Sequence, residues 1–126
     1  MYTKGVTPSE LVAAFIAAIE AGDIDAAIGH MSDDCEYDNV PIAKAIGHDQ
    51  IRTTLSMFVA PGVPTKFEVL RQAATGNVVM NERVDHLQIN GKSVSVPVAG
   101  VFEVAGAKIT LWRDYFDMGQ FTAQMA

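Results

Sequence analysis

Three short segments of the chain carry polar side chains of the kinds that perform acid–base chemistry. Tyr37 and Asn39 stand two positions apart in the first segment, Arg83 and Asp85 do so in the second, and Asp114 belongs to the third. Side chains two positions apart on a strand point to the same face of a sheet. If these faces turn inward, two carboxylates, a guanidinium, a phenol and an amide share one cavity. Because burying unpaired charges is costly, such a cluster indicates acid–base catalysis on a small apolar substrate.

Asp114 lies between two large aromatic residues, Trp112 and Phe116, which share its face of the expected strand. An inward orientation of this face would disfavour the charged form of the carboxyl group, unless a cation and hydrogen bonds offset the loss of hydration. The opposite face is no more apolar, so periodicity leaves a second interpretation open. In that interpretation, Arg113 and Asp114 form an exposed pair on an edge strand.

Arg83 is the cation that could offset this cost. Its planar guanidinium can hydrogen-bond Asp85 and Asp114 at once and fix their geometry. Two carboxyl groups around one arginine also allow one to be ionised while the other keeps its proton, which separates a base from an acid. The simpler alternative is an exposed pair between Arg83 and Asp85.

Tyr37 and Asn39 could together hold a water molecule. A phenol and an amide each donate and accept hydrogen bonds, so with one carboxylate they can fix a water at three points. Alternatively, both are polar residues at a strand end, with Asn39 capping the turn before Pro41.

The other reactive residue types show no spacing that is typical of a site. His30, His48 and His86 do not cluster, and Cys35 is typical of a small core residue. The sequence has no Ser/His/Asp order, Gly-rich phosphate loop or metal-ligand spacing. We therefore expect neither a cofactor nor a metal ion, and we interpret the histidines as structural or solvated.

Length and composition indicate one globular domain over residues 1–126, with a hydrophobic content of 49% that is enough for a core. The net charge of −6 and the scattered basic residues argue against nucleic acid or an anionic membrane as partner. No apolar run reaches the roughly 18 residues that span a membrane, and the N-terminus lacks an apolar signal core. With a single cysteine as well, we expect a cytoplasmic protein.

Helix signals dominate the first half of the chain. The run from Thr7 to Glu10 is typical of a capped helix start, and apolar residues at helical spacing follow it. Asp23 can cap a second, shorter helix, and Gly47 opens a third. Between these helices, residues 32–34 indicate a turn, and Cys35 to Val40 indicate a short strand.

The second half has the period of strands, at residues 66–73, 77–89, 93–104 and 108–117, and Asn90-Gly91 is a strong hairpin signal. Helices followed by a meander of long antiparallel strands predict an α+β fold, whose curved sheet has a concave face with a pocket. The tail can form a short helix. The apolar residues expected to line the pocket are Phe15, Ile28, Leu55, Phe58, Val96, Val98, Trp112 and Phe116.

The sequence resembles the limonene-1,2-epoxide hydrolase family in three segments that occur in the same order, Tyr37 to Pro41, Glu82 to Asp85 and Ile109 to Asp117. Gly100 to Phe102 also fits that family, and the resemblance extends from about Leu11 to Phe121. It implies a cystatin-like (nuclear-transport-factor-2-like) α+β fold, in which a curved mixed sheet encloses a deep pocket. It also implies a homodimer and the hydrolysis of an epoxide without a cofactor or a metal.

The resemblance assigns the family's Asp–Arg–Asp triad to Asp85, Arg83 and Asp114, and its water-holding pair to Tyr37 and Asn39. The expected reaction adds water to a small apolar epoxide and gives a vicinal diol without a covalent intermediate. Two alternatives stay open. One is an isomerase or cyclase of the ketosteroid-isomerase or polyketide-cyclase kind, which does not need an arginine bridge, and the other is a non-catalytic module that binds a small ligand.

Overall fold

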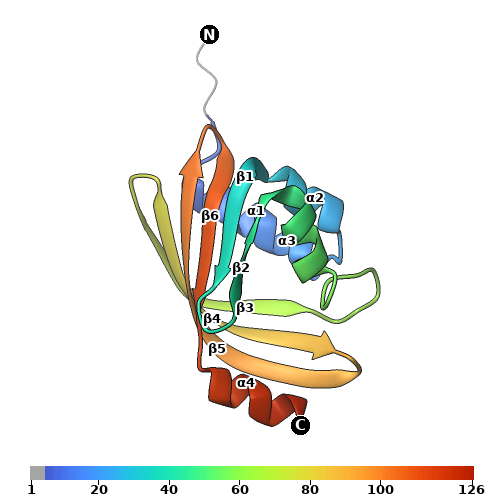
Figure 1. Ribbon diagram of the computed structural model, residues 1–126. Coiled ribbons are helices and arrows are strands. Elements are labelled where there is room, and N and C mark those ends of the chain that lie inside the picture. The colour runs from blue at the N-terminus through green and yellow to red at the C-terminus, as the bar shows by residue number, and fades with distance from the viewer. Residues whose placement is uncertain (1–4) are drawn as a thin grey trace.

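The computed structural model of the protein describes residues 5–126 (Figure 1). Residues 1–4, on which the expected lack of a signal segment partly rests, lie outside the described residues. Three helices cover one side of a strongly curved sheet, and a fourth helix lies at the far end, beside strands that bend away (Figure 1). The helices are α1 (Pro8–Glu20), α2 (Ile24–Gly29), α3 (Gly47–Leu55) and α4 (Met118–Met125).

Six strands form a mixed sheet in the order β2-β1-β6-β5-β4-β3. Neighbouring strands are antiparallel except β1 and β6, which run parallel. The predicted α+β fold, a cystatin-like cup, is therefore confirmed, and its meander consists of β3 to β6. The strands are β1 (Met31–Asn39), β2 (Ala43–Ile46), β3 (Lys66–Thr75), β4 (Val78–Ile89), β5 (Lys92–Ala105) and β6 (Lys108–Tyr115).

The helices begin where the sequence predicts. The Thr7 hydroxyl accepts a hydrogen bond from the Glu10 backbone N–H at 3.1 Å, and the Glu10 carboxylate accepts one from the Thr7 N–H at 2.9 Å, which completes the capping box. The Asp23 carboxylate caps α2 through the backbone N–H of Ala26 at 3.0 Å. These caps satisfy backbone donors that have no partner within the helix.

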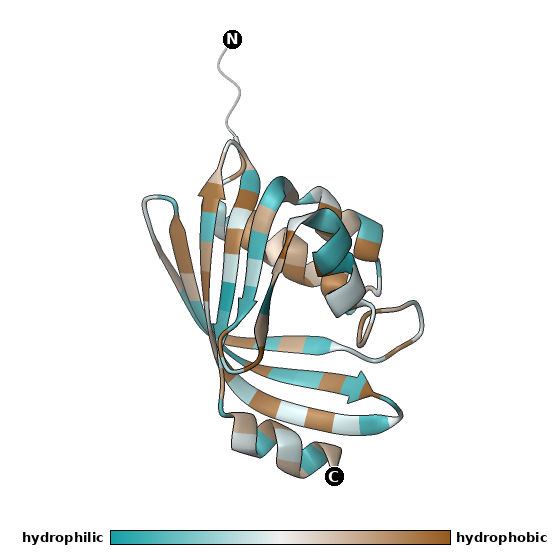
Figure 2. Cartoon of the chain, in the orientation of Figure 1, coloured by the Kyte–Doolittle hydropathy of each residue, from teal (hydrophilic) through white to brown (hydrophobic). Residues whose placement is uncertain are grey.

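The β4–β5 hairpin turns at Asn90-Gly91, as the sequence predicts. Both residues have positive φ values, 52° and 76°, which the two central positions of this tight turn require. Along β5, buried and exposed residues alternate. In Figure 2, the strand shows a matching alternation of more and less hydrophobic residues. Because the period is two, every second side chain of β5 points into the cup.

One local prediction is wrong, and one strand was missed. Residues 32–34 do not form a turn, because β1 already begins at Met31 and pairs with β6, with a register shift between Met31 and Glu36. The pairing to β6, including a hydrogen bond from the Ile109 N–H to the His30 carbonyl, overrides the local turn preference. Strand β2 was not predicted, since only one of its four residues, Ala45, is buried and no alternating pattern marks it.

The hydrophobic core lies between the sheet and helices α1 to α3, with the fully buried Trp112 at its centre. Phe15 packs edge-on against this indole with ring centroids 5.0 Å apart, and Phe102 stacks on it with centroids 6.1 Å apart. Cys35 is buried in the core as expected, and burial raises the pKa of its thiol to about 12. Within residues 5–126, no helix has the length and apolar character needed to cross a membrane.

Candidate active site

The register of the sheet places two of the predicted site residues, Asp114 and Asn39, in one row that crosses five strands. The paired residues in this row are Gln72, Asn81, Gly100, Asp114 and Asn39, in the spatial order β3, β4, β5, β6, β1. Paired residues on neighbouring strands share a face of the sheet. The row therefore places side chains from distant parts of the sequence side by side on the inner face.

Arg83 lies at the centre of the cluster and is fully buried. Its Nε and Nη2 donate to the two carboxylate oxygens of Asp85 at 2.9 and 3.0 Å, and Nη2 also donates to Asp114 Oδ2 at 2.8 Å. The third side of the guanidinium donates through Nη1 to Asn81 Oδ1 at 2.8 Å, and the Phe67 ring lies 4.9 Å from the guanidinium carbon. Arg83 thus bridges the two carboxyl groups, and the alternative of an exposed pair is wrong.

Asp114 is also buried, which overturns the alternative of an exposed pair with Arg113. Its Oδ1 accepts a hydrogen bond from the Trp112 indole N–H at 2.9 Å. Burial raises the pKa of this carboxyl group to about 6, the charge of Asp85 adds to the rise, and Arg83 and Trp112 oppose it. Burial also raises the pKa of Asp85, against the opposing effect of Arg83. The pair therefore keeps a proton to a higher pH than ordinary aspartates do.

Tyr37 lies on β1, which pairs with β6, the strand that carries Asp114. Its ring stacks on the Trp112 indole with centroids 3.8 Å apart and planes 5° from parallel. Burial is the main cause that raises the pKa of its hydroxyl, and a hydrogen bond with the Asn39 side chain opposes the rise. Tyr37 is thus a neutral hydroxyl whose ring is fixed by its aromatic neighbour, and Asn39 sits next to it.

All four of these groups, Tyr37, Asn39, Asp85 and Asp114, line one cavity of about 490 Å³. The rest of its wall is mainly apolar, and four of the predicted lining residues belong to it: Phe58, Val96, Val98 and Phe116. Volume and lining are typical of a site for a small apolar molecule with a few polar groups that orient it.

The other four residues predicted to line the pocket do not lie in its wall. Phe15, Ile28, Leu55 and Trp112 are buried in the core between the sheet and the helices. Periodicity identifies a residue as inward-facing, but it does not distinguish the packed part of the cup from the part that stays open. Trp112 still contributes to the site from beneath, through its stacking on Tyr37 and its hydrogen bond to Asp114.

Sequence reasoning missed several residues of the site. Asn81 and Phe67, which contact Arg83, carried no signal beyond their place in an inward strand face. The residues Met118, Phe121 and Met125 of α4 close one end of the cavity. Their spacing of three and four positions is that of one helical face, so this signal was present in the tail. The remaining apolar lining residues that were missed are Ile42, Ala43, Ala45, Met57, Leu87 and Ile89.

The site offers acid–base groups and no cluster of metal ligands. Among residues 5–126, no three His, Cys, Asp or Glu side chains gather in a way that could hold a metal ion. The chemistry available here is the transfer of protons to and from a bound molecule, by two carboxyl groups that share one arginine.

Comparison with known proteins agrees with this chemistry. The sequence pattern described as the limonene-1,2-epoxide hydrolase catalytic domain matches residues 6–126. The chain belongs to the limonene-1,2-epoxide hydrolase family. It is 37% identical over 107 residues to the epoxide hydrolase EphG of Mycobacterium tuberculosis strain H37Rv, an alignment that covers 85% of this chain and 71% of EphG. Membership of this family makes the protein an epoxide hydrolase, as the resemblance implied.

Solved structures extend the likeness to the fold. A structure of an LEH-like epoxide hydrolase from M. tuberculosis superposes with a TM-score of 0.78 at 35% identity, covering 93% of this chain and 87% of that one. A putative polyketide cyclase from Pseudomonas putida gives a TM-score of 0.82 at 22% identity, covering 97% of this chain and 100% of that one. The second match reflects the shared cup alone.

Proposed function

We propose that this epoxide hydrolase adds water to a small apolar epoxide in one step, by general acid and general base catalysis, and releases a vicinal diol. One observation carries the proposal: Arg83 bridges two buried carboxyl groups that both line a mainly apolar cavity. Because Asp85 and Asp114 share one cation, one carboxyl group can be ionised while the other keeps its proton.

In the proposed reaction, Asp114 is the base and Asp85 is the acid. The Trp112 indole N–H and an Arg83 N–H each donate to Asp114, which favours its ionised form. Asp85 also accepts two hydrogen bonds, both from the guanidinium that it shares with Asp114, and we assign the retained proton to it.

A water molecule held by Tyr37, Asn39 and Asp114 loses a proton to Asp114 as its oxygen attacks an epoxide carbon. The bond between that carbon and the epoxide oxygen breaks, and the oxygen takes the proton of Asp85. The pair then holds its proton on Asp114 instead of Asp85, and transfer of one proton between the two carboxyl groups restores the starting state. Each proton transfer contributes on the order of 10²- to 10⁴-fold to the rate.

The cavity supports an apolar substrate because, apart from the proposed catalytic groups and from Lys44 and Thr54, its wall consists of aliphatic and aromatic side chains such as Val96, Val98 and Phe116. A terpene-like or cyclic epoxide fits this chemistry. An isomerase on the same cup would need one base and one acid but no cation between them, so the Arg83 bridge favours the hydrolase.

The test is diol formation from limonene-1,2-epoxide and a panel of cyclic and linear epoxides. We expect turnover that is highest with apolar cyclic members of the panel. In water labelled with ¹⁸O, a single turnover should place the label in the diol and none in the protein, because no ester to a carboxylate forms. Label in Asp85 or Asp114 would reject the one-step mechanism, and the absence of turnover on every epoxide would reject the proposed substrate class.

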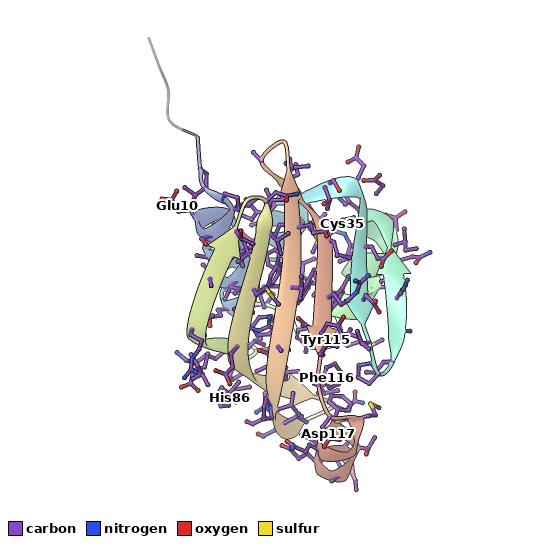
Figure 3. All side chains as sticks on the ribbon, turned by 90° about the vertical axis from the view of Figure 1, so that its left-hand side faces the viewer. Glu10, Cys35, His86, Tyr115, Phe116 and Asp117 are labelled. Carbon is purple, nitrogen blue, oxygen red and sulfur yellow. The ribbon has the colours of Figure 1, made fainter. Side chains whose placement is uncertain are left out.

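We also propose a homodimer formed through the outer face of the sheet. Apolar side chains of three neighbouring strands gather there, Met80 on β4, Val101 on β5 and Tyr115 on β6, and Figure 3 shows this face with Tyr115 labelled. Met80 and Tyr115 are 56% and 48% exposed, which is typical of a surface that a second copy covers. Light scattering should give twice the chain mass of 13.5 kDa, and a monomer mass would reject the proposal.

A further inference from the structure

Asn81 holds the third side of the Arg83 guanidinium. It precedes Arg83 by two positions on β4, is buried, and accepts the Nη1–H of Arg83 at 2.8 Å. It is not part of the cavity wall, so it does not touch a molecule bound there. Any influence of Asn81 on the reaction therefore acts through Arg83.

A chain of hydrogen bonds sets the direction of the Asn81 amide. The Asn81 Nδ2 donates to Gln72 Oε1 at 3.1 Å, and the Gln72 Nε2 donates to the backbone carbonyl of Ser9 at 3.3 Å. A carbonyl oxygen can only accept, so it orients the Gln72 amide, and Gln72 in turn directs the Asn81 oxygen toward Arg83. The first turn of α1 is thus connected to the Arg83 guanidinium through Gln72 and Asn81.

The neutrality of Asn81 matters because of the charges that surround it. The ionisable groups of this cluster are Arg83 and Asp85 on β4, Asp114 on β6 and Tyr37 on β1, and His86 acts on Asp85 from the outer face. The residues of β3 and β5 that pack here, including Phe67, Gln72 and Gly100, are uncharged. An amide satisfies the third side of the guanidinium without adding a titratable group, whereas an aspartate of similar size would add one.

We propose that Asn81 is a positioning residue of the epoxide hydrolysis. It locks the plane of Arg83 and, because it is uncharged, leaves two carboxyl groups and one shared proton at the site. The inference rests on the proposed function for its kinetic consequences, but its effect on the titration of the carboxyl groups can be measured without any epoxide.

The kinetic test uses two substitutions with different expected results. Asn81→Leu removes the acceptor at similar volume and should lower kcat by about 10- to 100-fold, with a KM within about threefold of the wild type, because Arg83 is misplaced while the cavity wall is intact. Asn81→Asp should extend activity to higher pH. The added negative charge disfavours loss of the last carboxyl proton and so raises its pKa. We therefore expect the basic limb of the kcat–pH profile to move up by about one pH unit or more.

The matched control is Asn77→Asp, which adds the same charge at an exposed position in the β3–β4 turn. It should leave both limbs of the pH profile in place. Circular dichroism and thermal melting must show that each variant is folded. An Asn81→Asp profile that coincides with that of Asn77→Asp, or an Asn81→Leu variant with wild-type kcat, would overturn the inference.

A titration of the free enzyme separates this inference from the proposed function. The ¹³C signals of the aspartate carboxyl carbons can be followed against pH in wild type, Asn81→Asp and Asn77→Asp. We expect the Asp85 and Asp114 signals to titrate at higher pH in Asn81→Asp alone. Unchanged titration in a folded Asn81→Asp would reject the role of Asn81, whatever the enzyme does with epoxides. Shifted titration without turnover of any epoxide would instead reject the proposed function.

Discussion

Asp114→Asn is expected to lower kcat by about 10³-fold or more on every epoxide that the wild type hydrolyses, because an amide cannot take the proton of the attacking water. The substitution also disturbs the hydrogen bonds. Both carboxylate oxygens accept, one from Trp112 and one from Arg83, whereas asparagine has a single acceptor. Its NH₂ group would face one of these donors at a cost of about 1–3 kcal/mol in the free energy of unfolding.

Asp33→Asn is the matched control, since Asp33 is exposed on β1 and faces no site residue. It should leave kcat unchanged. The measurement is diol formation under saturating epoxide, with circular dichroism to show that each variant is folded. A folded Asp114→Asn enzyme that keeps more than about a tenth of wild-type kcat would show that Asp114 is not the base, given the usual size of such a contribution.

The pH dependence follows from the direction of the pKa shift. Because burial raises the pKa of Asp114 from 3.8 to about 6, the folded protein holds this proton more tightly than the unfolded chain does. The carboxyl group therefore stabilises the fold most at pH values below its unfolded pKa, and this contribution is lost as the pH rises through its folded pKa. Activity changes in the opposite sense, since the base must be ionised, so we expect the acidic limb of kcat near pH 6. In Asp114→Asn, the decline of the melting temperature over this pH range should be smaller.

The sequence was sufficient to propose the members of the cluster, but its periodicity left open whether the strand faces that carry them turn inward. Arg83, Asp85 and Asp114 could be proposed as partners because each shares a face with apolar or aromatic neighbours. The pairing register that joins them could not be predicted. It depends on how β4, β5 and β6 pair, including the register shift between Glu103 and Val104 of β5. Such contacts are set by tertiary packing rather than by local pattern.

The cavity wall was harder to predict than the cluster. Phe15 and Leu55 lie on helix faces that point toward the sheet, as do residues of any packed core. The difference between core and pocket arises because β4 and β5 extend beyond the end of β6, where α4 packs against β5 (Figure 1). The second hydrophobic cluster forms in this place, where Val96 and Val98 meet Phe121 and Met125. No local pattern in the sequence predicts how far β4 and β5 extend beyond the end of β6.

Gly100→Ala is expected to lower kcat/KM by about 10²-fold or more, because a misplaced catalytic group typically costs this much. The backbone of Gly100 does not require glycine, since its φ lies outside the left-handed region. Glycine is needed here because there is no room for a side chain. Gly100 stands in the row between Asn81 and Asp114, and the guanidinium of Arg83 lies over it. A methyl group there would overlap Arg83 Nη1 and approach the side-chain oxygens of Asn81 and Asp114 to 2.9 Å.

The guanidinium cannot yield to this methyl group without losing one of its carboxyl partners, because it is held on three sides and buried. We therefore expect the overpacking to lower the free energy of unfolding by about 1–3 kcal/mol as well. Gly29→Ala is the control, since an added Cβ at Gly29 meets no atom within 4 Å. Diol formation and thermal melting of the two variants provide the measurement. Wild-type kcat/KM in Gly100→Ala would mean that Arg83 can move without loss of rate, and the fixed bridge between Asp85 and Asp114 would then not be required for catalysis.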